Sequence, residues 1–245
     1  MNVQISEKLG GLEGEAVYID TEGSFIAERV IEIIDGTANR LAALEPSAQH
    51  QHQQEISVEQ RAKELEGFTV DNVLSRIHYF RVHDYVEEIA LLNVLEDFVR
   101  DHPKVKLVVI DSIAFHFRYD FSDIALRTRL LNGMAQGLMR LAEESQLAVV
   151  LMNQMTTKIQ AGEAYQDQSI LTPALGESWG HACTSRVNLF WQDAQRHAQL
   201  FKSPSQKEQV VRYQIGRDGI QDVDDAASGK RKRAAPIVTE KHKKS

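Results

Sequence analysis

Apolar and polar residues follow two different patterns along the chain. Four short, mostly apolar runs have the length and composition of buried β-strands, namely residues 15–20, 76–82, 105–111 and 147–152. Between these runs, apolar residues recur every three or four positions, which is the period of an amphipathic helix. This helical spacing predicts helices at residues 24–41, 84–100 and 122–145. The first two would begin at the capping residues Ser24 and Asp84.

Apolar strands that alternate with amphipathic helices predict an α/β fold with a mostly parallel central sheet and helices on both faces. Three shorter apolar segments follow, at residues 186–191, 198–202 and 210–215, and we expect them to form an antiparallel extension. The pattern therefore places one domain within residues 1–215. Ligands of such sheets bind beyond the carboxyl ends of the strands, so the expected site lies just after Asp20, Asp111 and Met152.

Three segments show neither the strand pattern nor the helical spacing. Residues 46–66 are polar and include a Gln/His tract, which predicts a disordered surface insertion. Its histidines, His50 and His52, could bind a metal, but a solvated Gln/His loop is the favoured interpretation. Residues 156–173 are polar and glycine-containing, which indicates a mobile loop, and residues 216–245 are expected to form a disordered tail.

Charge is distributed unevenly over the 245 residues. Residues 229–245 carry seven Lys or Arg and one acid, a net +6, so the rest of the chain carries −13 of the total of −7. A body this acidic does not hold a polyanion through its overall field, and any nucleic-acid binding has to come from local clusters. The basic run Lys230, Arg231, Lys232 and Arg233 predicts nuclear import, with a solubilising tail as the alternative.

Two further features restrict the class of protein. Cys183 is the single cysteine, so a disulfide framework is excluded and a reducing compartment is expected. A small, half-buried side chain is the favoured interpretation of this thiol over a catalytic nucleophile. No apolar run approaches the roughly 18 residues that cross a membrane.

Polar side chains stand at three of the predicted strand ends. Glu22 follows the first strand, Asp111 and Ser112 close the third, and Gln154 follows the fourth. A carboxylate that orients water, a carboxylate at Mg²⁺ and an amide near a terminal phosphate are the groups that phosphoryl transfer to water requires. Each position alone has a simpler explanation, because Asp suits turns at the ends of buried strands.

Several long strings resemble the RecA-like strand-exchange ATPases, and most closely the eukaryotic Rad51 paralogues. They are YIDTEGSF (18–25), LVVIDSIAFHFR (107–118), the run from 126 to 159 and PALGESWGHA (173–182). The short string SPSQKE (203–208) resembles one particular paralogue. The resemblance covers roughly residues 3–215 and implies a RecA-like ATPase core that binds ATP with Mg²⁺.

The resemblance assigns roles at matching positions. Glu22 is similar to the catalytic glutamate, and Asp111 to the acid that holds Mg²⁺ through water, with Ser112 beside it at the nucleotide. Gln154 is similar to the amide that couples the terminal phosphate to the DNA loops, and Pro204 to the cap over a neighbouring subunit's nucleotide.

The resemblance also implies DNA contacts. Residues 118–129 are similar to the first DNA-binding loop and residues 156–173 to the second, so Arg118, Arg127, Arg129 and Lys158 are candidate phosphate contacts. For Arg127 and Arg129 the alternative is a solvated helix face, and for Lys158 it is an ordinary polar loop.

One departure from the family pattern concerns the phosphate loop, G-x-x-x-x-G-K-[ST], whose backbone N–H groups cradle phosphates. The only Gly-Lys pair is Gly229-Lys230, where Arg231 follows and Asp224 stands in place of the first glycine. The chain therefore resembles an N-terminally truncated member of the family, which is expected to be inactive alone.

Two functions remain open from the sequence. The first is an ATP-binding, DNA-stimulated ATPase subunit that acts in repair by homologous recombination. Its partners would be single-stranded and branched DNA, other recombinase paralogues and the strand-exchange recombinase, in the nucleus with a cytoplasmic pool. The second is a non-catalytic assembly module that keeps the paralogue contacts. A ring-shaped replicative helicase domain shares the fold, but SPSQKE and GESWGHA disfavour it.

Overall fold

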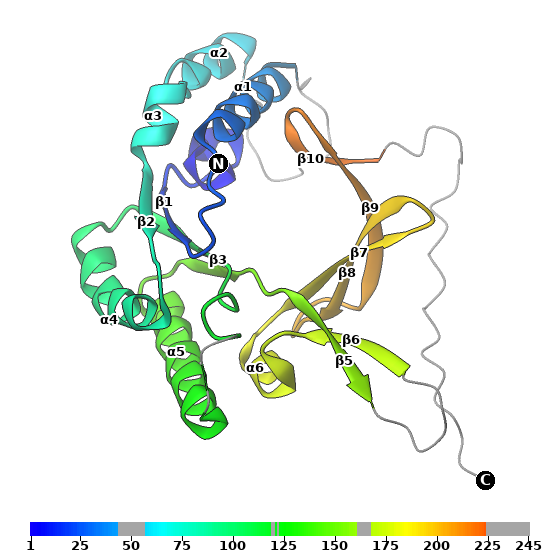
Figure 1. Ribbon diagram of the computed structural model, residues 1–245. Coiled ribbons are helices and arrows are strands. Elements are labelled where there is room, and N and C mark those ends of the chain that lie inside the picture. Colours follow the sequence, from blue (N-terminus) through cyan, green and yellow to red (C-terminus); the bar gives the residue numbers. More distant parts are fainter. Residues whose placement is uncertain (44–56, 119–120, 122, 161–167, 224–245) are drawn as a thin grey trace. The chain divides into compact units, whose positions relative to one another are not determined.

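A computed structural model describes residues 1–43, 57–118, 121, 123–160 and 168–223. The chain divides into two compact units, Met1–Cys183 and Thr184–Ser245, so the division falls inside the predicted core of residues 1–215. Each unit is described by itself below (Figure 1).

The first unit is built on a parallel sheet in the order β2-β1-β3-β4. Its strands are β1 (Glu15–Asp20), β2 (Ile77–Arg81), β3 (Val105–Asp111) and β4 (Ala148–Leu151), all within the four predicted runs. The helices are α1 (Ala27–Ala43), α2 (Val58–Glu66), α3 (Val70–Ser75), α4 (Tyr85–Asp101), α5 (Ile124–Glu144) and α6 (Gly176–Ala182). Two short 3₁₀ turns, Asn2–Gln4 and Glu7–Leu9, precede β1.

The strand order explains why the helices cover both faces. The chain moves one way along the sheet from β1 to β2, and the opposite way from β2 to β3 and from β3 to β4. Because parallel crossovers are right-handed, α1 lies on one face and α4 and α5 on the other, as Figure 1 shows. The reversal occurs between β1 and β3, which is where ligands of doubly covered sheets bind.

The hydrophobic core lies between the sheet and helices α4 and α5. Its fully buried members come from the two central strands, from the segment after β3 and from α4, among them Val17, Ile19, Val108, Ile110, Phe117 and Leu95. One acid shares this interior: Glu88 on α4 is fully buried, and its carboxylate has no hydrogen-bond partner in the part of the chain that the structure describes.

The second unit is an antiparallel sheet in the order β10-β9-β8-β7. Its strands are β7 (Arg186–Gln192), β8 (Gln195–Lys202), β9 (Gln209–Gly216) and β10 (Gly219–Asp222). The predicted α/β fold with an antiparallel extension is thus confirmed. The extension is longer than predicted, because β10 lies within the segment after residue 216 that we expected to be a tail.

Two other expectations need correction. Helix α2 occupies residues 58–66 of the segment expected to be disordered. There Ser57 and Gln60 form a reciprocal capping box that starts the helix. Residues 156–173 contain a β-hairpin of β5 (Met155–Gln160) and β6 (Gln168–Pro173) rather than only a mobile loop. His50, His52 and the basic run 230–233 lie outside the described residues.

Candidate functional site

The carboxyl ends of β1 and β3 are fixed side by side. Asp20 is paired with Asp111 in the sheet register, and the Thr21 N–H donates to the Asp111 carbonyl at 2.9 Å. The Ser112 N–H donates to Thr21 Oγ1 at 2.7 Å, and the Thr21 hydroxyl donates to the Ser112 carbonyl at 2.9 Å. These bonds hold the two loops that carry the predicted site residues in a defined relation.

Asp20 shapes the loop that carries Glu22. Its Oδ1 accepts the N–H groups of residues 22–24 at 3.0, 2.6 and 3.2 Å, while Oδ2 accepts from the Phe25 N–H and the Tyr79 hydroxyl. Burial alone raises the pKa of Asp20, but these donors outweigh it and hold the pKa below its ordinary value. Asp20 therefore acts as a structural carboxylate, a role that the sequence analysis did not assign.

Glu22, Ser112, Gln154 and Arg118 form one chain of hydrogen bonds. The Glu22 Oε1 atom accepts from the Ser112 hydroxyl at 2.7 Å and from the Gln154 side-chain Nε2 at 2.5 Å. The Arg118 guanidinium donates to Gln154 Oε1. The fold thus brings together three predicted nucleotide-site residues from three strand ends, together with one predicted DNA contact.

Asp111 accepts a hydrogen bond from the Tyr18 hydroxyl at 2.9 Å. Burial, and then the bond to this carboxylate, raise the pKa of Tyr18, so the phenol stays protonated and keeps donating. Tyr18 was not among the predicted site residues. The two-residue period of a strand, which places Tyr18 on the same face as Asp20, could have indicated it.

The chemistry of this edge suits a hard cation better than it suits phosphate. Asp111, Glu22 and Ser112 offer carboxylate and hydroxyl oxygens, the donors that Mg²⁺ prefers. Over the described ranges, no group of three or more His, Cys, Asp or Glu side chains could hold a metal by itself. A magnesium ion here would take most of its ligands from water and from a nucleotide, as Mg²⁺ usually does.

The remaining predicted DNA residues lie in different settings. Arg127 donates from Nε to the Phe117 carbonyl at 2.7 Å and from Nη2 to the Ala174 carbonyl at 3.4 Å, and burial lowers its pKa. It therefore ties the start of α5 to two other segments. Arg129 is exposed on α5, and Lys158 lies in β5 opposite Ile170.

Pro204 lies exposed between β8 and β9, in the second unit. The structure tests no nucleotide contact for it, and its role stays a prediction.

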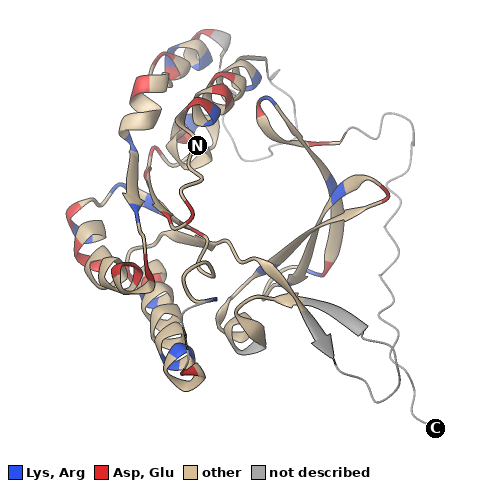
Figure 2. Cartoon of the chain, viewed as in Figure 1, with Lys and Arg blue, Asp and Glu red and all other residues tan. Residues whose placement is uncertain are grey.

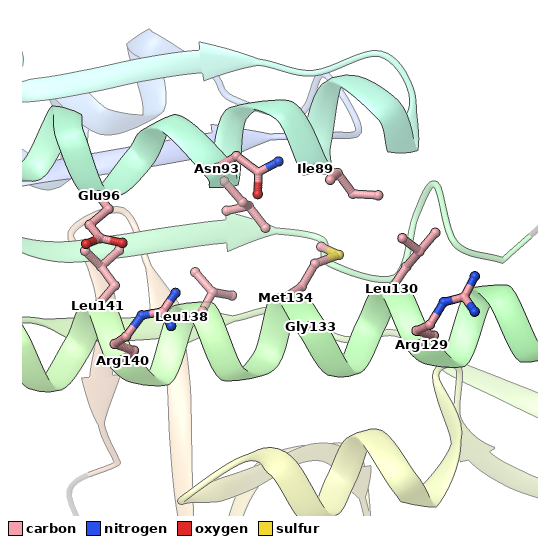
Figure 3. Close-up of a pocket in the computed structure, with 12 residues that line it drawn as sticks. Ile89, Asn93, Glu96, Arg129, Leu130, Gly133, Met134, Leu138, Arg140 and Leu141 are labelled. Atoms are coloured by element: carbon pink, nitrogen blue, oxygen red, sulfur yellow. The ribbon is translucent and has the colours of Figure 1, made fainter.

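A groove of about 330 Å³ runs between α4 and α5 (Figure 3). Ile89, Leu130, Met134 and Leu138 are among its apolar lining residues, and Glu96, Arg129 and Arg140 are its charged ones. Gly133 and Gly137 also line it, and a Cβ atom at either glycine would meet nothing within 4 Å apart from its chain neighbours and the backbone of its own helix. Figure 2 shows acidic residues along α4, while most residues of α5 are uncharged.

The parallel sheet in the order β2-β1-β3-β4, its covering helices and the antiparallel strands that follow define a RecA-like α/β fold. The sequence model of the Rad51 family matches residues 36–223, and the chain belongs to the Rad51 family. No helix in the described part of the chain is both long and apolar enough to span a membrane.

The chain is similar to two proteins named DNA repair protein RAD51 homolog 3. It is 49% identical to the one from Cricetulus griseus, over 93% of this chain and 59% of the relative. It is 43% identical to the one from Dictyostelium discoideum, over 91% of this chain and 55% of the relative. The chain is also 32% identical to DNA repair and recombination protein RadA of Aeropyrum pernix, over 91% of this chain and 60% of the relative. The chain thus spans somewhat more than half the length of these relatives.

Proposed function

We propose that these residues form the larger part of the ATPase core of a recombinase paralogue, of the C type, that acts in DNA repair by homologous recombination. The observation that carries this proposal is the hydrogen-bonded group of Glu22, Ser112 and Gln154 beside Asp111 at the strand ends. The similarity to RAD51 homolog 3 supports the same role.

Each residue of the group has a chemical task in ATP hydrolysis. The Glu22 carboxylate would orient a water molecule and take its proton, and Asp111 would be the residue that holds Mg²⁺. Ser112 and Gln154 hold the Glu22 carboxylate in place by donating to Oε1. ATP with Mg²⁺, when bound, supplies the transferable phosphoryl group and the neutralising charge.

A segment outside these 245 residues would fold together with them and supply the phosphate loop. No G-x-x-x-x-G-K-[ST] motif occurs in the chain. In the described sheet β3 pairs directly with β4, which leaves β4 as an edge strand; Val150 in β4 is 43% exposed, and Met152 just after it is 40% exposed. The 245 residues alone are therefore expected to bind Mg-ATP weakly and to be poorly stable.

The partners and location belong to the proposal as well. Single-stranded and branched DNA would be bound by Arg118, Arg129 and Lys158, with other recombinase paralogues and the strand-exchange recombinase as protein partners. The run from Lys230 to Arg233 directs the protein to the nucleus, with some protein remaining in the cytoplasm. Deletion of residues 229–245 from a fluorescent fusion should then leave the fusion cytoplasmic, and persistent nuclear accumulation would contradict this assignment.

A non-catalytic assembly module is the second candidate, favoured by the missing Gly-Lys-Thr or Gly-Lys-Ser sequence. The two are separated by testing repair in cells that depend on this gene. Loss of repair in a Glu22→Gln variant supports hydrolysis at this site. Full repair by that variant, together with undiminished binding to the other paralogues, would establish the assembly module instead.

A further inference from the structure

The hydrogen bonds that begin at Glu22 continue through Gln154 to Arg118, a residue that the proposed nucleotide chemistry does not use. Arg118 follows the buried segment after β3, whose Phe117 is fully buried, and its guanidinium reaches across to Gln154 after β4. A positively charged side chain at this position joins a predicted DNA contact to the predicted catalytic carboxylate through a single amide.

The chemistry of the three groups dictates how that amide is oriented. A guanidinium has only donors, and an ionised carboxylate has only acceptors. The Gln154 Oε1 atom must therefore face Arg118, and its NH₂ group must face Glu22, as the two bonds require. Arg118 is the second of two restraints on this orientation, so its loss leaves the amide held by the bond to Glu22 alone and freer to rotate.

Phosphate is a stronger partner for Arg118 than a neutral amide oxygen. Arginine binds phosphate through two parallel, charge-assisted hydrogen bonds, whereas Gln154 offers one uncharged acceptor. A nucleic-acid phosphate that engaged Arg118 through two parallel bonds would compete with Gln154 Oε1 for the guanidinium N–H groups.

We propose that Arg118 is a positioning residue that sets the orientation of Glu22 through Gln154, and that a DNA phosphate competes with Gln154 for its guanidinium. This inference rests on the proposed function, since it takes DNA as the source of the phosphate. The Glu22 Oε1 atom accepts two side-chain bonds in this arrangement. Release of Arg118 loosens the bond from Gln154 and makes that oxygen available to a water molecule.

Competition predicts that two substitutions in contact change DNA affinity in opposite directions. In the 245-residue chain, Arg118→Ala should weaken binding of a fluorescent oligo(dT), while Gln154→Ala should tighten it by up to about tenfold, because a hydrogen bond to a charged group contributes on that scale. In the double variant the gain from Gln154→Ala should vanish. Arg100→Ala, which removes an exposed arginine paired with Asp97, is the matched control.

Fluorescence anisotropy measures these affinities, and thermal melting checks that each variant folds. Unchanged or weaker binding by Gln154→Ala would overturn the competition, because a bond that is merely structural leaves no hidden affinity to release. The same conclusion follows if the gain persists in the double variant, or if neither the wild-type chain nor Gln154→Ala binds oligo(dT).

The positioning role has a readout that needs neither DNA nor ATP. In ¹⁵N-glutamine-labelled protein, the side-chain NH₂ signals of Gln154, assigned by their loss in Gln154→Ala, should shift in Arg118→Ala and stay in place in Arg100→Ala. Signals that do not move in Arg118→Ala would disprove the positioning role. Failure of ATP hydrolysis alone would count against the proposed function and leave this result standing.

Discussion

The two units of the chain differ in where their apolar side chains go. In the first unit, β1 and β3 lie inside a sheet covered by helices, and Val17, Ile19 and Val108 are fully buried. In the second unit, the cross-strand partners Leu189 and Ala198 share one face with Val211, since paired residues lie on the same side of a sheet. We call this the apolar face. Its side chains are each 50–68% exposed, namely those of Val187, Leu189, Trp191, Val211, Ile215 and Ile220.

The difference shows what a sheet needs in order to be stable. Strands contribute burial only when a second layer covers their apolar face, and a single antiparallel sheet has no such layer. Every buried hydrophobic side chain in the described residues belongs to the first unit. The stability of the described chain is therefore expected to reside in Met1–Cys183, and the second unit depends on another surface to cover its apolar face.

Substitutions in the buried core of the first unit should have the largest effect on stability. Phe117 is fully buried, and its ring stacks on that of Phe121 with 5.3 Å between the ring centroids. Phe117→Ala should therefore lower the free energy of unfolding by about 3–5 kcal/mol. The matched change Val211→Ala, on the apolar face, should cost no more than about 0.5 kcal/mol. Urea denaturation of both variants gives the values. A cost of several kcal/mol at Val211 would mean that the apolar face is covered in solution.

Hydrogen exchange tests the same contrast without mutation. The amides of Val108 and Ile110 in β3 should exchange at least about a thousandfold more slowly than those of Val211 and Tyr213 in β9, because local opening of an uncovered sheet costs little. Mass spectrometry of peptic fragments is the measurement. Equal protection of the two strands would show that the units unfold together.

Glu88 gives the first unit a dependence on pH. Burial raises the pKa of Glu88 from 4.5 to about 8, so between these values the folded chain keeps a proton that the unfolded chain has released. The free energy of unfolding should therefore fall as pH rises through this window, by at most about 1.4 kcal/mol for each pH unit, and level off above it.

The variant Glu88→Gln has no such proton to hold. It should gain stability over the wild-type chain steadily from pH 5 to pH 8, as measured by urea denaturation at each pH. A wild-type profile that runs parallel to that of Glu88→Gln would show that the carboxylate has a partner in solution.

Arg127 and Arg129 lie two residues apart on α5 but in different settings, and the expected effects of their loss are the smallest. Because Arg127 donates to the Phe117 and Ala174 carbonyls, Arg127→Ala should cost about 1–3 kcal/mol of stability. Exposed Arg129 should affect only DNA binding. Its loss should reduce the slope of log affinity against log salt by about 0.7 for single strands. Binding of oligo(dT) over a salt series measures this slope. An unchanged slope in Arg129→Ala would leave Arg129 as a residue of the solvated helix surface.

Local pattern fixed most of the secondary structure in advance. The strands at residues 15–20 and 105–111 have the predicted bounds, because an unbroken apolar run between polar residues leaves few alternatives. The predicted cap Asp84 accepts from the N–H groups of Val86 and Glu87. Helix α2 was missed although the Ser57–Gln60 capping box is visible in the sequence, because the polar composition of the segment outweighed it. Strand β10 was missed because four residues are too short for a periodic signal.

The sequence by itself determined which residues stand at strand ends, and so proposed Glu22, Asp111, Ser112 and Gln154. It could not determine which of those ends meet, since that depends on the strand order and on crossovers between distant segments. Only the tertiary structure turned Arg127 toward two backbone carbonyls and Arg118 toward Gln154. Propensity and period act over a few neighbouring residues, whereas the orientation of a charged side chain is settled by the donors and acceptors that folding brings beside it.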